Sequence, residues 1–390
     1  MKKQSFNLIF VIALGLSSCY SGKNSESYNT TVKNDYLVYL TAPQIGEPQL
    51  TLYDPANNKH TQVLTITRRD NSFSLSKDNR LAFAKDGNVY IWNYPFTANT
   101  PTEITFDEAP TAEKTVLSWS SDGRYLLLTE AQADSKKLLL WDGKNFSEIY
   151  NPQREIYFYR AKWSNNGELA FTEYFIDNTS WKISTGETFI WDGKDVVNFS
   201  KNPSMYYLWS EDGQLAFLSY QDGEYKISVW DGKSKNHGAP NIKTVIIPDV
   251  MVSPASNLTW TRSGSIVFIG HGKTDSHTQV YEWDGQTARN VSQTPSRNNY
   301  GVAWRNDGYW SAYDNFTMYV RDNANQTILE TKGATSRWTQ SGLLVFCKPN
   351  GINWTLSVWN GKSIVDITDG DYILAKWTNS NGESILCTFG

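Results

Sequence analysis

The sequence predicts an all-β fold, a single β-propeller built from four-stranded antiparallel blades. A tryptophan recurs along the chain at spacings of 34 to 51 residues, with a mean of 43. This period fits a four-stranded blade and exceeds the roughly 34 residues of helix-pair repeats. Two further observations support the prediction, since a turn glycine follows each tryptophan and a second motif, Trp-Asp-Gly, lies between them. The repeat tryptophans are Trp119, Trp163, Trp209, Trp260, Trp304, Trp338 and Trp377.

The first half of each repeat predicts a hairpin, which we call strands A and B. Trp119 is followed by Asp122 and Gly123 and then by the apolar run 125–128. An Asp-Gly or Asn-Gly pair between two short apolar runs is a strong hairpin signal, because both residues tolerate a positive φ. The same turn recurs at Asn166-Gly167, Asp212-Gly213, Ser263-Gly264, Asp307-Gly308, Ser341-Gly342 and Asn381-Gly382.

The second half of each repeat predicts strands C and D, joined at the Trp-Asp-Gly motif. After Trp141-Asp142-Gly143, for example, residues 146–150 form the expected last strand. A single meander of four strands cannot bury both of its faces, so the blades must pack side by side in a ring. The other copies are Trp191-Asp192-Gly193, Trp230-Asp231-Gly232, Trp283-Asp284-Gly285 and the variant Trp359-Asn360-Gly361.

Counting the repeats predicts eight blades. Seven complete modules begin near Phe73, Leu117, Ala161, Tyr207, Leu258, Val302 and Ser336. The eighth blade is expected to combine residues 375–390 with residues 35–66, so that both ends of the chain close the ring. This assignment leaves one strand too many, because 384–389 and 36–40 both resemble strand B and one of them must then be an extra edge strand. A seven-bladed ring with loose termini is the alternative.

The paired motifs resemble the bacterial WD40-like repeats of the Tol-system periplasmic propeller and of many envelope lipoproteins. The resemblance covers nearly all of the chain after its first 34 residues. It implies a propeller fold and a place in the cell envelope. It implies little about activity, because propellers host binding, scaffolding and several enzyme chemistries.

The N-terminus predicts export and lipid anchoring. Lys2 and Lys3 precede the apolar run 8–16, which is too short to span a membrane, and the pattern is that of a signal peptide over 1–18. Leu16-Ser17-Ser18-Cys19 resembles the bacterial lipobox, in which the cysteine becomes the acylated first residue. We therefore expect a lipid on Cys19, a flexible tether over 19–34 and the propeller over 35–390. Tyr20 in place of Asp resembles the default for the outer membrane of Gram-negative bacteria.

Composition excludes some partners. The formal charge of −4 becomes −6 once the two lysines of the signal peptide are removed, and no basic cluster with interleaved aromatics is present, so nucleic acid is not an expected partner.

Apart from Cys19, the cysteines are Cys347 and Cys387. Both are assigned to strand B of neighbouring blades, where Cα separations often exceed the limit of about 7 Å for a disulfide, so the sequence favours two buried thiols.

Motifs for catalysis or metal binding are sparse. His271, His277 and Asp275 share one loop, but they lack helical i, i+4 spacing and a second cluster, so a polar hairpin tip is the favoured interpretation. The sequence contains no Gly-x-Ser-x-Gly elbow and no His-Glu-x-x-His motif, and we assign no catalytic residue, metal or cofactor. Paired carboxylates converging across the ring remain open.

The variable loops give the candidate ligand surface. The A/B and C/D turns of a propeller lie on one face, and the B/C turns and D/A connections lie on the other, which we call the loop face. Rigid aromatics and arginine dominate binding hot spots, and most tryptophans here are structural by register. The candidates expected on the loop face are Arg154, Tyr157, Tyr159, Trp181, Met205, Tyr206, Tyr220, Tyr225, Arg297, Tyr300 and Trp354. Of these, Trp181 and Trp354 are assigned to B/C connections because they lie outside both repeat tryptophan motifs.

These features predict a monomeric, non-catalytic envelope lipoprotein that binds a protein or peptide through its loop face. Two alternatives use the same surface. In one, exposed rings stack on sugars and the propeller is a glycan-recognition module. In the other, converging carboxylates make it a hydrolase that acts on glycans or peptides.

Overall fold

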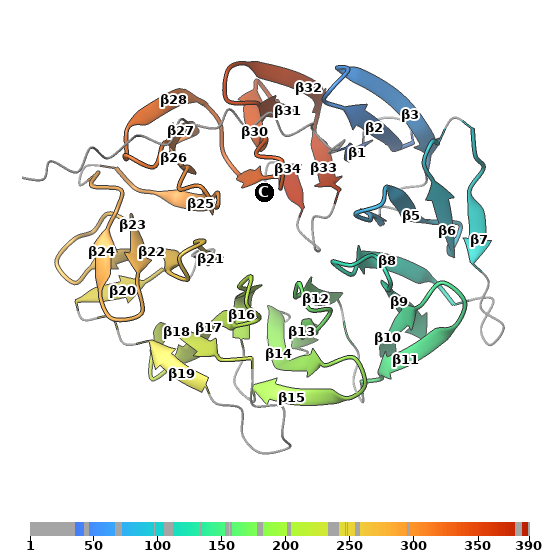
Figure 1. The fold of residues 1–390 in the computed structure, drawn as a ribbon, viewed down its shortest axis with the longest axis horizontal. Helices are drawn as coiled ribbons and strands as arrows, with labels where there is room; N and C mark the ends of the chain where they lie inside the picture. The colour runs from blue at the N-terminus through green and yellow to red at the C-terminus, as the bar shows by residue number, and fades with distance from the viewer. Residues whose placement is uncertain are drawn as a thin grey trace, which may run out of the picture. The chain divides into compact units, whose positions relative to one another are not determined.

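Eight antiparallel sheets are arranged in a ring around a central axis (Figure 1). The computed structural model describes residues 36–390 except 43–46, 67–71, 97, 105–111, 133–134, 153–155, 157, 178–181, 201–203, 233–241, 246, 248, 254–257, 295–296, 379–383 and 389–390. The described residues contain no helix of the length and apolarity needed to cross a bilayer. Cys19 and the regions expected as signal peptide and tether lie outside the described residues, so these assignments stay predictions.

Seven blades follow one another along the chain. Blade 1 is β4 (Phe73–Leu75), β5 (Arg80–Lys85), β6 (Asn88–Asn93) and β7 (Thr102–Ile104); blade 2 is β8 (Lys114–Trp119), β9 (Leu126–Gln132), β10 (Ser135–Trp141) and β11 (Phe146–Tyr150). Blade 3 is β12 (Phe158–Trp163), β13 (Leu169–Asp177), β14 (Lys182–Trp191) and β15 (Val196–Ser200); blade 4 is β16 (Ser204–Trp209), β17 (Leu215–Gln221), β18 (Glu224–Trp230) and β19 (Ile242–Val245).

The next three blades keep the same order, with one modification in blade 5. There strand A is split, because β20 and β21 pair with opposite ends of β22. Blade 5 is β20 (Val250–Val252), β21 (Thr259–Trp260), β22 (Ile266–Gly272), β23 (Gln279–Trp283) and β24 (Ala288–Asn290). Blade 6 is β25 (Tyr300–Trp304), β26 (Trp310–Asp314), β27 (Thr317–Arg321) and β28 (Thr327–Lys332); blade 7 is β29 (Ser336–Trp338), β30 (Leu344–Asn350), β31 (Asn353–Trp359) and β32 (Ile364–Gly370).

The terminal blade joins both ends of the described chain. Its strand A is β33 (Tyr372–Trp377), and β1 (Leu37–Ala42), β2 (Gln49–Asp54) and β3 (Lys59–Thr65) supply strands B, C and D. The pairing of β33 with β1 runs from Leu37 opposite Trp377 to Ala42 opposite Tyr372. The short β34 (Ile385–Thr388) pairs with the other edge of β33 and is the extra strand that the sequence left unassigned. The eight-bladed prediction is confirmed and the seven-bladed alternative is wrong.

The A/B turns have the chemistry that their sequence indicates. The hydroxyl of Ser120 accepts the backbone N–H of Tyr125 at 2.9 Å and donates to the Asp122 carboxylate at 2.7 Å. Gly123 follows with a φ of 74°, in the left-handed region that favours glycine. In blade 1, where asparagine replaces this glycine, Asn79 has a φ of 61°. Asparagine tolerates this conformation better than most residues, so the turn survives the substitution.

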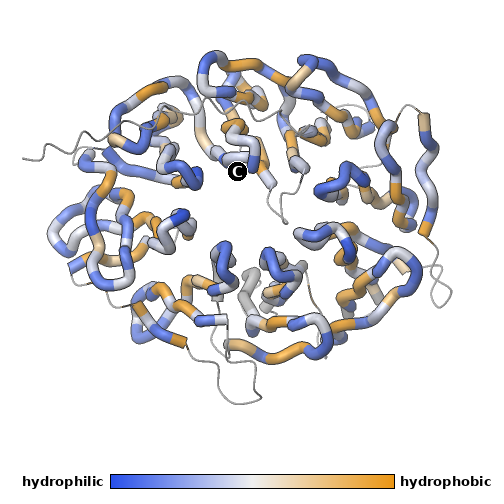
Figure 2. Tube along the Cα trace, in the orientation of Figure 1, coloured by the Kyte–Doolittle hydropathy of each residue, from blue (hydrophilic) through white to orange (hydrophobic). Residues whose placement is uncertain are grey.

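In four blades the two tryptophans of the repeat meet inside their own blade. The indole rings of strands A and C pack edge-to-face in blades 2, 3, 4 and 7, with centroids 5.9 to 6.1 Å apart. The strand A indole also reaches the preceding blade. Trp209 Nε1 donates to the carbonyl of Lys162 and Trp260 Nε1 to that of Leu208, each at 3.0 Å. The repeat tryptophans therefore tie neighbouring blades together, as the sequence predicts, and Figure 2 shows apolar segments recurring in every blade.

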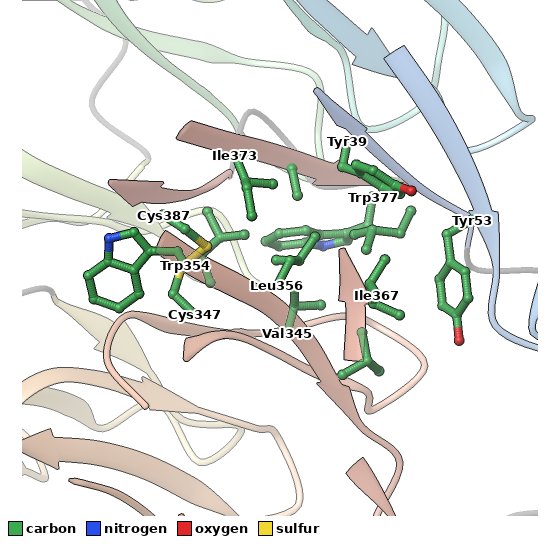
Figure 3. Packing of buried hydrophobic residues seen from close by; sticks show 14 of the residues in the cluster. Tyr39, Tyr53, Val345, Cys347, Trp354, Leu356, Ile367, Ile373, Trp377 and Cys387 are labelled. Atoms are coloured by element: carbon green, nitrogen blue, oxygen red, sulfur yellow. A yellow bond between two sulfur atoms is a disulfide. The ribbon is translucent and has the colours of Figure 1, made fainter. Parts of the chain in front are cut away.

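A disulfide joins Cys347 of β30 to Cys387 of β34, with the Cα atoms 5.5 Å apart. The expectation of two separate thiols is therefore wrong. It placed Cys387 in strand B of the last blade, a position that β1 occupies instead. As an added strand, β34 packs against β30 and β31 of blade 7, and this brings the two sulfurs together beside Trp354 (Figure 3).

Candidate functional site

The inner strands of the ring surround a cavity of about 450 Å³. Figure 1 shows β8, β12, β16, β21 and β25 nearest to the axis. The position immediately before the repeat tryptophan contributes to the lining in all seven blades that carry this tryptophan. These residues are Ser118, Lys162, Leu208, Thr259, Ala303, Arg337 and Lys376. We call this cavity the channel site.

Four cationic side chains line the channel site. They are Arg160 and Lys162 of β12, Arg337 of β29 and Lys376 of β33. The described lining residues include no aspartate or glutamate. The sequence reasoning missed this cluster because its members fall in three separate segments of the chain, at 160–162, 337 and 376. The signal was present in the repeat, where three of the seven positions before the tryptophan are basic and none is acidic.

Lys376 is enclosed by the backbone of two neighbouring blades. Its Nζ donates to the carbonyl oxygens of Phe73 at 2.7 Å and of Leu117 at 3.2 Å. Burial, followed by the charge of Lys162, lowers the pKa of the Lys376 amine to about 8. The side chain still presents part of its surface to the channel. It therefore links the terminal blade to blades 1 and 2 while contributing charge to the cavity.

The two arginines are positioned differently. The guanidinium of Arg160 lies 4.9 Å from the ring centroid of Tyr206 and 5.6 Å from that of Tyr174, and the residue as a whole is exposed. Arg337 is half-buried, and its Nη1 donates to the carbonyl of Ser336 at 2.7 Å. Arg160 is thus held by aromatic ring faces and Arg337 by a backbone carbonyl. These are uncharged groups, so they do not offset the positive charge of either guanidinium. Both retain the fork of N–H donors that suits carboxylate and phosphate groups.

Two residues predicted for the loop face are core residues. Trp354 lies within β31, is only 5% exposed and packs 5.9 Å from the ring of Phe316. The expectation that it lies in a B/C connection is therefore wrong, because the hairpin turn precedes it and the strand pleat directs its ring inward. Tyr159 of β12 is also buried, and its hydroxyl donates to the carbonyl of Lys136. Arg154, Tyr157 and Trp181 lie outside the described residues.

Other predicted residues do lie at the surface. Tyr220 is 54% and Tyr300 is 37% exposed, Arg297 is exposed, and Tyr206 and Tyr225 are half-buried. Met205 falls in β16, at the start of strand A. The structure separates these residues over blades 4 to 6 instead of gathering them at one point. Their role in binding stays a prediction.

The loop face carries further apolar side chains that sequence reasoning missed. Phe316, at the β26–β27 turn, is 51% exposed, and Ile352, at the β30–β31 turn, is 79% exposed. Met251 of β20 is also exposed on this side. Large apolar residues at hairpin tips, where polar residues are usual, were the available signal. Five of the eight exposed large hydrophobic side chains among the described residues thus lie on the loop face: Tyr220, Met251, Tyr300, Phe316 and Ile352.

The histidine loop of blade 5 forms a polar tip. His277 Nδ1 lies 3.4 Å from the Asp275 carboxylate, whereas His271 Nδ1 contacts the carbonyl of its neighbour Gly272. Within the described part of the chain, no group of three or more His, Cys, Asp or Glu residues could hold a metal ion.

Comparisons with solved structures support the fold where the TM-score exceeds 0.5. Dipeptidyl peptidase 4 from Porphyromonas gingivalis matches at a TM-score of 0.53 and 15% identity, over 82% of this chain and 55% of its own. A structure described as the eukaryotic initiation factor matches at a TM-score of 0.54 and 11% identity, over 88% of this chain and 89% of its own. TolB from Acinetobacter baumannii matches at 17% identity over 64% of this chain and 62% of its own, with a TM-score of 0.37.

These similarities concern the fold alone. The chain spans about half the length of the dipeptidyl peptidase, at 55% coverage, so that enzyme contains much that has no counterpart here. No family model matches the sequence. A search of curated proteins finds no match either.

Proposed function

We propose that this chain is a non-catalytic binding propeller of the cell envelope, anchored through a lipid on Cys19, and that it binds a protein or peptide on its loop face. The proposal is carried by one observation: five of the eight exposed large hydrophobic side chains among the described residues lie on that face. Exposed apolar residues cost free energy in water, and when they gather on one side of a rigid scaffold they commonly mark an interaction surface.

Two further features support this proposal. Disulfides form and persist in oxidising compartments, and the bond between Cys347 and Cys387 is therefore consistent with export. The apolar side chains at the β26–β27 and β30–β31 turns are held by short hairpins. Little backbone entropy is then lost on binding, so that more of the contact energy is available for affinity.

In-cell photo-crosslinking tests the proposal. A photoreactive amino acid at Ile352 should give a discrete protein adduct, and the same amino acid at Lys194, in a C/D turn on the opposite face, should give none. The added substitution Phe316→Asp should abolish the adduct at position 352 by placing a charge in the apolar surface. Adducts of equal yield at both positions, or none at either, would refute binding through the loop face.

Fractionation tests the anchoring separately. The wild-type protein should remain with the membrane fraction, and Cys19→Ala should release it in soluble form or leave its precursor unprocessed. Wild-type protein that is soluble after cell disruption would contradict the lipid anchor without bearing on the loop face.

A further inference from the structure

The channel site is lined by positive charge, whereas the chain as a whole has a negative net charge. The formal charge of the whole sequence is −4, yet four cations and no described carboxylate line the central cavity. They come from three different blades, so folding has brought them together and no single basic segment accounts for them. A cavity lined by one sign of charge between walls of low dielectric concentrates its electrostatic potential.

The cations are close enough to interact. Burial is the main cause of the lowered pKa of Lys376, and the nearby charge of Lys162 lowers it further. Repulsion of this kind disfavours the protonated site, and a bound anion would relieve it. The hydrogen bonds of Lys376 to two carbonyls hold the amine in place, so it need not reorganise to meet a ligand.

The geometry also limits the size and type of ligand. A cavity of about 450 Å³ admits a small molecule and excludes a folded domain. Guanidinium groups such as those of Arg160 and Arg337 bind planar carboxylates or phosphates through paired N–H donors, whereas lysine amines act as point charges. Hydroxyl groups of Ser118, Thr259 and Ser384 are further hydrogen-bonding groups in the lining.

We propose that the channel site binds a small polyvalent anion that carries two or more carboxylate or phosphate groups. Cations from three different strands, β12, β29 and β33, suit a ligand with several negative charges better than a single monovalent ion. This site is distinct from the loop face and does not depend on the function proposed for that face.

Isothermal titration calorimetry tests the proposal. The purified chain, residues 20–390, is titrated with citrate and, separately, with tripolyphosphate. Sodium chloride at matched ionic strength serves as the control titrant. Arg160→Gln and Arg337→Gln should each raise the dissociation constant about tenfold, as expected for the loss of one charge-assisted contact. Lys194→Gln removes an exposed cation from the C/D turn between β14 and β15, on the face opposite the loop face, and should leave the affinity unchanged. Phe316→Asp on the loop face should also leave it unchanged.

Binding of either anion with this pattern of variants supports the proposal, and the preferred anion identifies the carboxylate or the phosphate class. Circular dichroism confirms that each variant is folded. No heat beyond the sodium chloride control, or equal affinities in the wild type and both arginine variants, would overturn it.

Discussion

Removing the disulfide provides the most quantitative check on the terminal blade. The bond joins β30 to β34 across 40 residues of sequence, which include the outer strands of blade 7 and all of β33. Both cysteines are 1% exposed and belong to the apolar cluster between blade 7 and the terminal blade. Cys347→Ala combined with Cys387→Ala removes the bond and leaves no buried thiol.

The expected loss in the free energy of unfolding follows from the length of the loop that the disulfide closes. In the chain-entropy account, crosslinking about 40 residues stabilises the folded state by about 4 kcal/mol. The six register pairs between β1 and β33 do not involve the cysteines, so the ring should stay closed in the variant. With a urea m value of about 3 kcal/mol per M, the loss corresponds to a midpoint lower by about 1.3 M.

Urea unfolding followed by tryptophan fluorescence measures this loss. Wild-type protein reduced with dithiothreitol before unfolding should show the same midpoint as the double variant, and the reduced double variant should show no further change. If the midpoint of the double variant falls by less than about 0.3 M, or if reduction leaves the wild type unchanged, the bond does not restrain the terminal blade as described.

Two other predictions concern the blade interfaces and the channel. Trp163 is 2% exposed, and its Nε1 donates to the hydroxyl of Ser118 in the preceding blade, so Trp163→Ala should lower the free energy of unfolding by about 3 to 5 kcal/mol. The matched change Tyr220→Ala at the surface should cost less than about 1 kcal/mol in the same urea titration, and comparable losses at both sites would contradict the interblade role. Lys376 has a pKa of about 8 in the folded chain against its usual 10.5, so the unfolded chain holds this proton more tightly and stability should rise as the pH increases from about 8 towards 10.5. Between pH 7 and 9.5 the wild type should gain about 1 kcal/mol relative to Lys376→Met, allowing for partial exposure of the amine. The Lys162 amine and the carbonyls of Phe73 and Leu117 are the groups that face it, and parallel pH profiles of the two proteins would refute this assignment.

The repeat could be predicted from the sequence because its motifs depend only on residues that are close together in the chain. A turn needs a positive φ within a few residues of its strands, so Asp122-Gly123 and its equivalents reveal the hairpins without knowledge of their neighbours. Trp163 and Trp209 recur at the same register because each blade meets the next in the same way. The number of blades followed from counting these units.

The candidate sites required the closed ring. Trp354 was expected in a B/C connection because it lies outside both repeat tryptophan motifs, but a shift of one residue at a hairpin decides which side of the strand a residue faces. The exposed tips at Phe316 and Ile352 were visible as residues, yet only the ring shows that they share one face.

The sequence by itself determined the all-β class, the hairpins and the eightfold repeat, because these depend on turn chemistry and on a period of two along each strand. The tertiary structure decided which terminal strand became strand B, that Cys347 and Cys387 are joined, and that Arg160, Arg337 and Lys376 face one cavity. These features depend on how blades distant in sequence are placed around a common axis. No local pattern encodes that placement, since it results from the packing of all the blades together.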